Sequence, residues 1–323
     1  MQKKPFEEIL SEVNRKFGSP VEPEELVESF PLSDVMDKEI LMHREAHFGG
    51  KFDIMLEYYY SGGKGTHPEF QLRRMEELKA LEDSMEENLA GLLLSGAEAE
   101  EVARARDVYK KLRDLYGENS SEARIPRLIA DLILSEEPEA EMETEAIIAE
   151  GKKIIPFLLD LLRSEDFHNP LFPGYGQAPF LAAKCLGLIG EEKAIISLFE
   201  NIGRGDFENE KMVIKALKNV GDPAKDFLLK VVSSKPFSED NERAALALIQ
   251  FQDDPRVAES CLGLLENPEI FAHDSLATYL ILACEGLKDP GKRERFAAIA
   301  KKSDLPSHFK QDIQAVINSW DTA

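Results

Sequence analysis

The chain has 323 residues and a formal net charge of −22 at pH 7, from 61 acidic and 39 basic residues. This balance argues against a nucleic-acid partner and against an anionic membrane surface, because both are bound through clustered Lys and Arg. No apolar run approaches the length of a membrane span, and the start has no apolar core of signal-peptide length, so we expect a cytoplasmic protein without a membrane partner.

Residues 1–120 are expected to form helices separated by polar turns. The turns are SPVEPEE (19–25), SGGKGTHPE (61–69) and GENSSEA (117–123). Between them, residues 70–94 and 98–116 each have a long mixed-charge helical pattern. These residues are interpreted as an N-terminal helical cap or adjacent domain.

Two histidines in the segment HREAH, His43 and His47, lie four residues apart and therefore on one face of a helix. Zinc hydrolases with such a pair carry a glutamate next to one histidine, whereas Glu45 stands in the middle here. A metal would need further ligands, of which Asp53 is the nearest candidate. A structural pair is the favoured interpretation, and no metal or cofactor is predicted.

The segment SGGKGT (61–66) resembles part of a phosphate-binding loop but departs from it at two positions. Tyr58 stands where the first glycine of that loop is required, and Gly65 occupies the place of the magnesium-binding Ser or Thr. A glycine-rich turn between helices is therefore expected.

The stretch 164–180, SEDFHNPLFPGYGQAPF, lengthens one turn well beyond its counterparts in the C-terminal part of the chain. Insertions in repeat proteins map to loops on one face, which is often the binding face. Its candidate contact residues are Phe167, His168, Phe172 and Tyr175. The alternative is that these aromatic side chains fold back to cover an exposed edge.

A repeat of 31 to 36 residues follows, anchored at Gly190, Gly221, Gln252 and Lys288. The apolar positions lie 8, 7, 5, 4 and 1 residues before each anchor, which is the spacing of one helix face. They are Ala182, Ala183, Cys185, Leu186 and Ile189; Val213, Ile214, Ala216, Leu217 and Val220; Ala244, Ala245, Ala247, Leu248 and Phe251; and Leu280, Ile281, Ala283, Cys284 and Leu287. An acidic residue after each anchor is expected to open the next helix.

Shorter apolar helices are expected between the anchored ones. Their ranges are 154–162, 194–202, 225–232, 256–265 and 293–300, with a degenerate first unit at 124–150 and a closing helix at 311–320. Each unit is thus a helix, a short turn and a second helix. The three cysteines, Cys185, Cys261 and Cys284, lie inside apolar runs and are expected to be buried and reduced.

Part of the chain resembles HEAT repeats of the short bacterial type found in phycobilin lyase subunits. The segments that carry the resemblance are AAKCLGLIGEEKAI, VIKALKNVGDPAKDFL and ERAALALIQFQDDP. The resemblance covers residues 121–323 and implies an all-α solenoid of five to six helix pairs, with residues 1–120 as the N-terminal region. HEAT-type deoxyhypusine hydroxylases bind iron through His-Glu pairs, and this sequence contains no such pair. The resemblance implies a binding surface rather than an activity.

In a HEAT-like stack the second helices line the concave surface. Lys184 and Lys215 share one repeat offset there, and Lys218, Asn219 and Gln250 lie near it. With the 164–180 loop, they are the predicted contacts of a protein partner, although such lysines also occur on ordinary solvated faces. The alternative function is an enzyme or accessory lyase with a small-ligand or metal pocket between the N-terminal helices and the first repeats. That pocket would be lined by His43, Glu45, His47, Asp53 and the loop.

Overall fold

The computed structural model describes residues 35–117, 124–303 and 305–320. These residues form α-helices and short 3-10 helices and contain no β-strand. The all-α fold class is therefore confirmed for the described part of the chain. The predicted turn at 19–25 and most of the turn at 117–123 lie outside it.

Contacts divide the chain into two compact units. The first runs as far as Pro138 and includes Asp166–Gly176, while the second comprises Glu139–Glu165 and the chain from Gln177 onward. Helix α8 (Arg124–Leu134) thus belongs to the first unit. The boundary after residue 120 that the sequence suggests stays a prediction.

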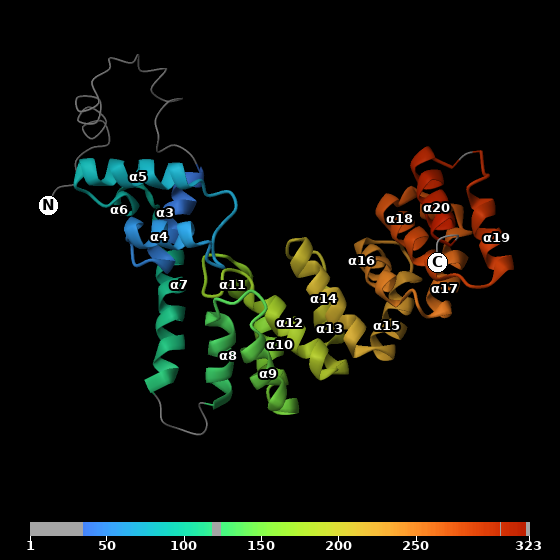
Figure 1. Ribbon diagram of the computed structural model, residues 1–323, viewed down its shortest axis with the longest axis horizontal. Coiled ribbons are helices and arrows are strands. Elements are labelled where there is room, and N and C mark those ends of the chain that lie inside the picture. The colour runs from blue at the N-terminus through green and yellow to red at the C-terminus, as the bar shows by residue number, and fades with distance from the viewer. Residues whose placement is uncertain (1–34, 118–123, 304, 321–323) are drawn as a thin grey trace, which may run out of the picture. The chain divides into compact units, whose positions relative to one another are not determined.

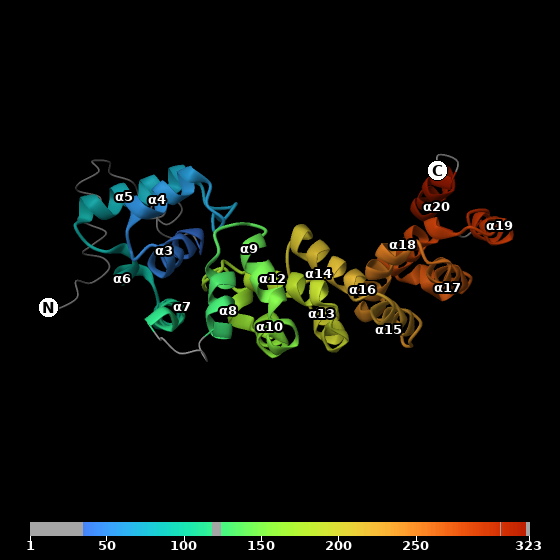
Figure 2. The same ribbon diagram turned by 60° about the horizontal axis from the view of Figure 1, so that its bottom comes forward.

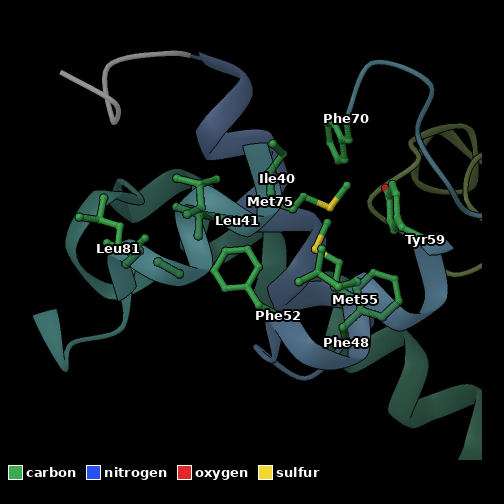
Figure 3. Packing of buried hydrophobic residues seen from close by; sticks show 13 residues of the cluster. Ile40, Leu41, Phe48, Phe52, Met55, Tyr59, Phe70, Met75 and Leu81 are labelled. Carbon is green, nitrogen blue, oxygen red and sulfur yellow. The ribbon is translucent and has the colours of Figure 1, made fainter. Parts of the chain in front are cut away.

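The first unit contains α3 to α8, coloured blue to green in Figure 1. Besides α8, these helices are α3 (Val35–His47), α4 (Phe52–Ser61), α5 (Leu72–Met85), α6 (Leu89–Leu93) and α7 (Gly96–Asp114). Helices α3, α4 and α5 enclose the larger core of this unit, and Figure 3 shows Leu41, Phe52, Met55 and Met75 converging on one another. All four are 4% exposed or less.

The 70–94 segment forms two helices and not one. Glu86 adopts a left-handed conformation with φ 55° and ends α5, and Asn88 then caps α6 by accepting a hydrogen bond from the Gly91 amide at 3.2 Å. The expectation of a glycine-rich turn after α4 is confirmed. Gly62 ends α4 with φ 70°, and α5 begins only at Leu72.

The second unit contains α9, α10 and α12 to α20. The first helices of the pairs are α10 (Ile155–Arg163), α13 (Ile195–Glu200), α15 (Asp222–Val232), α17 (Pro255–Leu265) and α19 (Pro290–Ile299). The second helices are α9 (Glu141–Ala149), α12 (Ala178–Ile189), α14 (Phe207–Val220), α16 (Glu239–Leu248), α18 (Asp274–Ala283) and α20 (Ser307–Trp320). These bounds agree with the helices expected from the sequence to within a few residues.

Helices of the second unit contact their neighbours in sequence order. Helix α12 packs on α9 and on α14, and α18 packs on α16 and on α20. In Figure 2, α12, α14, α16 and α18 lie in one row, and α10, α13, α15 and α17 lie in a second row beside it. The apolar positions of the repeat form the interior between them: all are 6% exposed or less except Ile189 and Val220, which are partly exposed.

Small residues let the second helices approach closely. A Cβ atom placed on Gly187 of α12 would lie 2.5 Å from the Cα of Ala216 on α14. Of the acidic residues expected to open the first helices, Asp289 caps α19, whereas Asp222 lies inside α15 and the neighbouring Asp254, not Asp253, caps α17. Asp254 accepts a hydrogen bond from the Arg256 amide at 2.9 Å at the start of α17, and Asp289 accepts one from the Lys292 amide at 2.9 Å at the start of α19.

Candidate functional site

The predicted lysine positions of the second unit meet around one pocket of about 220 Å³ on α12 and α14. Its lining is Glu139, Lys184, Leu188, Glu208, Lys211, Met212, Lys215, Ala216 and Asn219. Lys184, Lys215 and Asn219 are thus brought together as their shared repeat positions suggest. The exposed residues of this lining are Glu139, Leu188, Glu208, Lys211, Lys215 and Asn219, whereas Lys184 and Met212 are half-buried. We refer to Lys184, Leu188, Lys211, Met212 and Lys215 as the lysine surface.

The three lysines of this surface differ in how far their charge is neutralised. Lys184 Nζ donates to the Glu139 carbonyl oxygen at 2.7 Å and to its carboxylate at 2.6 Å, and this contact lowers the pKa of Glu139. Lys211 lies 3.5 Å from the Glu208 carboxylate. Lys215 is exposed and makes no ion pair or hydrogen bond with any described residue. Lys215 is therefore the cation most available to a partner.

Apolar side chains lie between these cations. Leu188, one helical turn after Lys184 on α12, is 49% exposed, and Met212 is half-buried on α14. The surface therefore offers the exposed Lys215 beside an accessible aliphatic patch, while Lys184 and Lys211 each lie next to a glutamate of the same pocket.

Two other predicted contact residues lie outside this pocket. Lys218 sits 4.8 Å above the Phe251 ring and 4.0 Å from the Asp253 carboxylate. Gln250 is exposed on the 3-10 turn that follows α16. Both residues are close to Lys215 or its equivalent in repeat offset, but neither lines the pocket.

The 164–180 insertion begins with the short helix α11 (Glu165–His168) and then packs within the first unit. Asp166 lies 3.6 Å from Arg104, the Asn169 amide donates to the Glu101 carboxylate at 2.9 Å, and Phe172 is 1% exposed. Phe167, His168 and Tyr175 are half-buried. Phe172 thus belongs to the core, whereas the other three keep part of their surface accessible.

The two histidines of HREAH are neighbours in an aromatic cluster. The rings of His43 and His47 lie 4.4 Å apart, and the Tyr175 ring lies 4.6 Å from His47 and 6.1 Å from His43. Gly65 allows this packing, because a Cβ there would stand 2.2 Å from the Tyr175 ring. The histidines are therefore part of the packing that holds the 164–180 insertion against α3.

The hydrogen bonds of His47 define its tautomer. Nε2 lies 3.0 Å from the Pro170 carbonyl oxygen, which can only accept, so Nε2 carries the proton. Nδ1 then accepts from the Tyr109 hydroxyl at 2.7 Å. Burial lowers the pKa of His47 to about 4 and lowers that of His43 well below its ordinary value, so both rings are neutral at pH 7.

Glu45 and Asp53, which the sequence grouped with these histidines, have other partners. Glu45 bonds to Arg44 at 2.8 Å and to Arg106 at 2.5 Å, and the exposed Asp53 pairs with Lys79 at 3.2 Å. Among the described residues, no three His, Cys, Asp or Glu side chains are placed to hold a metal ion together.

A second pocket of about 330 Å³ lies in the first unit and includes His43. Its lining is Glu39, Met42, His43, His67, Phe70, Glu101, Asn169, Pro170 and Leu171. Sequence reasoning pointed to His43 and the insertion but missed Glu39, His67 and Glu101. Only Glu39 carried a signal, since it lies four residues before His43 and so on the same helix face.

The cysteines offer no nucleophile in this structure. Cys185, Cys261 and Cys284 are free and buried, and burial raises the pKa of Cys185 to about 11 and that of Cys261 to about 12. Thiols with such pKa values stay protonated at pH 7 and react slowly. Within the described ranges, no helix combines the length and the apolar character needed to cross a membrane.

Comparisons with known proteins give no match: no family model, no curated protein and no solved structure is similar to this chain. The resemblance to HEAT repeats therefore rests on the sequence register and stays a prediction.

Proposed function

We propose that the second unit is a HEAT-like α-solenoid that binds another protein through the lysine surface. The observation that carries this proposal is the position of Lys184 and Lys215. They occupy the same place in successive repeats, on neighbouring helices, and line one pocket with the exposed Leu188. Repeat proteins use such rows of equivalent side chains as extended binding surfaces.

The chemistry of the surface defines the partner. The lysines and the aliphatic patch suit a segment in which carboxylates flank a Leu, Met or Phe side chain. Such carboxylates would bind Lys215 directly and would compete with Glu139 and Glu208 for Lys184 and Lys211. The apolar contact supplies affinity and the charges supply orientation and association rate. The chain as a whole is strongly acidic, so nucleic-acid and other acidic partners would be repelled elsewhere on its surface.

The proposal is tested by selecting peptides from a random display library on the full chain. We expect enriched sequences with Asp or Glu on either side of one large apolar residue. The double substitution Lys184→Glu and Lys215→Glu should weaken the selected peptides by at least about 100-fold, because two charge-assisted contacts become repulsive.

The matched control is Lys230→Glu, an exposed lysine on α15 outside the pocket lining. It changes net charge in the same direction and should leave the affinity within about twofold. If both variants weaken binding equally, only net charge is being measured and the assigned surface is wrong. Deletion of the 164–180 insertion is unsuitable as a test, because Phe172 is a core residue.

A further inference from the structure

The 330 Å³ pocket of the first unit is independent of the lysine surface. Its walls come from α3, from the segment before α5, from Glu101 of α7 and from residues 169–171. Its volume is at the lower end of the range of small-molecule sites, so it suits a compact ligand.

A buried polar atom at the wall of this pocket lacks a partner. His43 is 4% exposed, and its Nε2 makes no hydrogen bond with any described residue. The ring is held in place by the rings of His47, at 4.4 Å, and of Phe70, at 5.5 Å. Leaving such an atom unpaired is unfavourable, and a ligand in the pocket would provide the missing hydrogen bond.

The pocket carries two carboxylates and no basic side chain of Lys or Arg. Glu39 lies one helical turn before His43 and makes no ion pair or hydrogen bond within the described ranges. Glu101 accepts from the Asn169 amide through Oε1, and its other oxygen has no partner among the same residues. The nearby cations are engaged: Lys38 pairs with Glu98 at 3.0 Å, and Arg104 pairs with Asp166 at 3.6 Å.

The remaining walls are apolar or aromatic. Met42, Pro170 and Leu171 supply aliphatic surface, and Phe70 stacks on His67 with ring centroids 4.5 Å apart. His67 Nδ1 accepts from the Glu69 amide at 3.3 Å, which leaves its Nε2 as a donor. The two carboxylates attract an ammonium group by charge, and the aliphatic and aromatic walls accept an apolar body.

We propose that this pocket binds a small organic cation, whose ammonium group lies between Glu39 and Glu101 and donates to His43 Nε2, and whose apolar body lies against Met42, Phe70 and Leu171. A carboxylate or phosphate ligand would be repelled by the two glutamates. A metal ion would find no group of three ligating side chains among the described residues.

The test compares three probes of similar size and different charge on the full chain by isothermal titration calorimetry at pH 7. Phenethylamine is the cation, 2-phenylethanol is the neutral probe and 3-phenylpropanoate is the anion. We expect saturable binding with one site per chain for phenethylamine, and affinities at least about tenfold lower for the other two probes.

Glu39→Gln and Glu101→Gln should each weaken phenethylamine binding by about tenfold or more, while the glutamine at 101 can still accept the bond from Asn169. Glu100→Gln is the control, because Glu100 is exposed on the same helix and does not line the pocket. Equal binding of the alcohol and the amine would overturn the assignment, as would phenethylamine affinity unaffected by either glutamine variant. Absence of phenethylamine binding at millimolar concentration would also overturn it.

Discussion

At the scale of single residues, the first unit maintains several polar side chains in an apolar interior. His43 and His47 are neutral because burial disfavours their charged forms, and Arg44 is fully buried beneath the Phe52 ring. The stability of the fold should therefore depend on pH through the histidines and on a defined carboxylate partner through Arg44.

The histidines predict a loss of stability in mild acid. Since the pKa of His47 is about 4 in the folded chain and 6.5 when unperturbed, the unfolded chain binds more protons between these values. The stabilisation is present above the unperturbed pKa of 6.5 and is lost as pH falls towards 4. For His47 the loss is roughly 2 kcal/mol between pH 7.5 and pH 5.0. Urea unfolding at pH 7.5 and at pH 5.0 would measure it.

The comparison variant is His47→Gln, whose amide can serve the Tyr109 hydroxyl and the Pro170 carbonyl without titrating. We expect its free energy of unfolding to change less between the two pH values than that of the wild type. An equal change in both proteins would show that His47 does not contribute to the acid dependence.

We expect truncation of the Arg44 side chain to lower the free energy of unfolding strongly. Its guanidinium donates to both Glu82 carboxylate oxygens, at 2.8 and 2.7 Å, and to Glu45. Arg44→Met would leave these carboxylates without their buried partner and should cost about 3–5 kcal/mol in thermal or urea unfolding. Arg73→Met is the control: the Arg73 side chain is 88% exposed and forms a surface pair with Glu77, so a change below about 0.5 kcal/mol is expected.

The candidate sites were only partly predictable at this scale. Lys184 and Lys215 could be paired from the sequence because a repeat fixes which positions are equivalent. His43 could be selected for its spacing from His47, but Glu101 and His67 join it through tertiary packing that no local pattern encodes. Of the two partners of Glu45, Arg44 is its neighbour in sequence, but Arg106 lies on a different helix and is similarly non-local.

At the scale of helices, the apolar register predicted the elements of the second unit well. Five apolar offsets recur in four units, so the buried face of each helix could be assigned from several independent positions. Small residues at those positions let α12 pack against α14. The break after α5 was missed because Glu86 adopts a conformation that usually marks glycine or asparagine.

The close contact between α12 and α14 predicts that a larger residue at Gly187 is destabilising. Gly187→Ala would place a methyl group 2.5 Å from the Ala216 Cα and 2.9 Å from its carbonyl oxygen, so the helices must separate. We expect a loss of about 1–3 kcal/mol in urea unfolding.

Gly263→Ala is the matched control on α17, where an added Cβ meets nothing within 4 Å. The same substitution there should stabilise the protein by up to about 1 kcal/mol, because alanine favours the helix. Opposite signs for the two variants are the expected outcome; a stabilising Gly187→Ala would mean that α12 and α14 are not in this contact.

At the scale of the whole molecule, the sequence indicated an insertion at 164–180 but not the unit that it completes. Its Phe172 joins a small core with Val102 and Ala105 of α7. The first unit is therefore built from two separate stretches of chain. The sequence pattern could not show this, because residues 166–176 lie between helices of the second unit in sequence but pack in the first unit.

This arrangement predicts how fragments behave. A fragment of residues 139–323 keeps Leu171 and Phe172 but lacks the α7 residues that bury them. It should bind the dye ANS and associate at micromolar concentration, whereas the same fragment with 166–176 replaced by a Gly-Ser linker of equal length should do so less. Fluorescence and light scattering would measure the difference, and indistinguishable fragments would contradict it.

The discontinuous first unit also has a consequence during synthesis on the ribosome. Residues as far as Pro138 emerge first, but the partners of His47, Glu101 and Arg104 on the insertion are added only later, up to Gly176. The first unit can therefore complete its aromatic cluster only after α9 and α10 of the second unit have left the ribosome. The N-terminal unit therefore cannot finish folding until the first helices of the C-terminal unit have been synthesised.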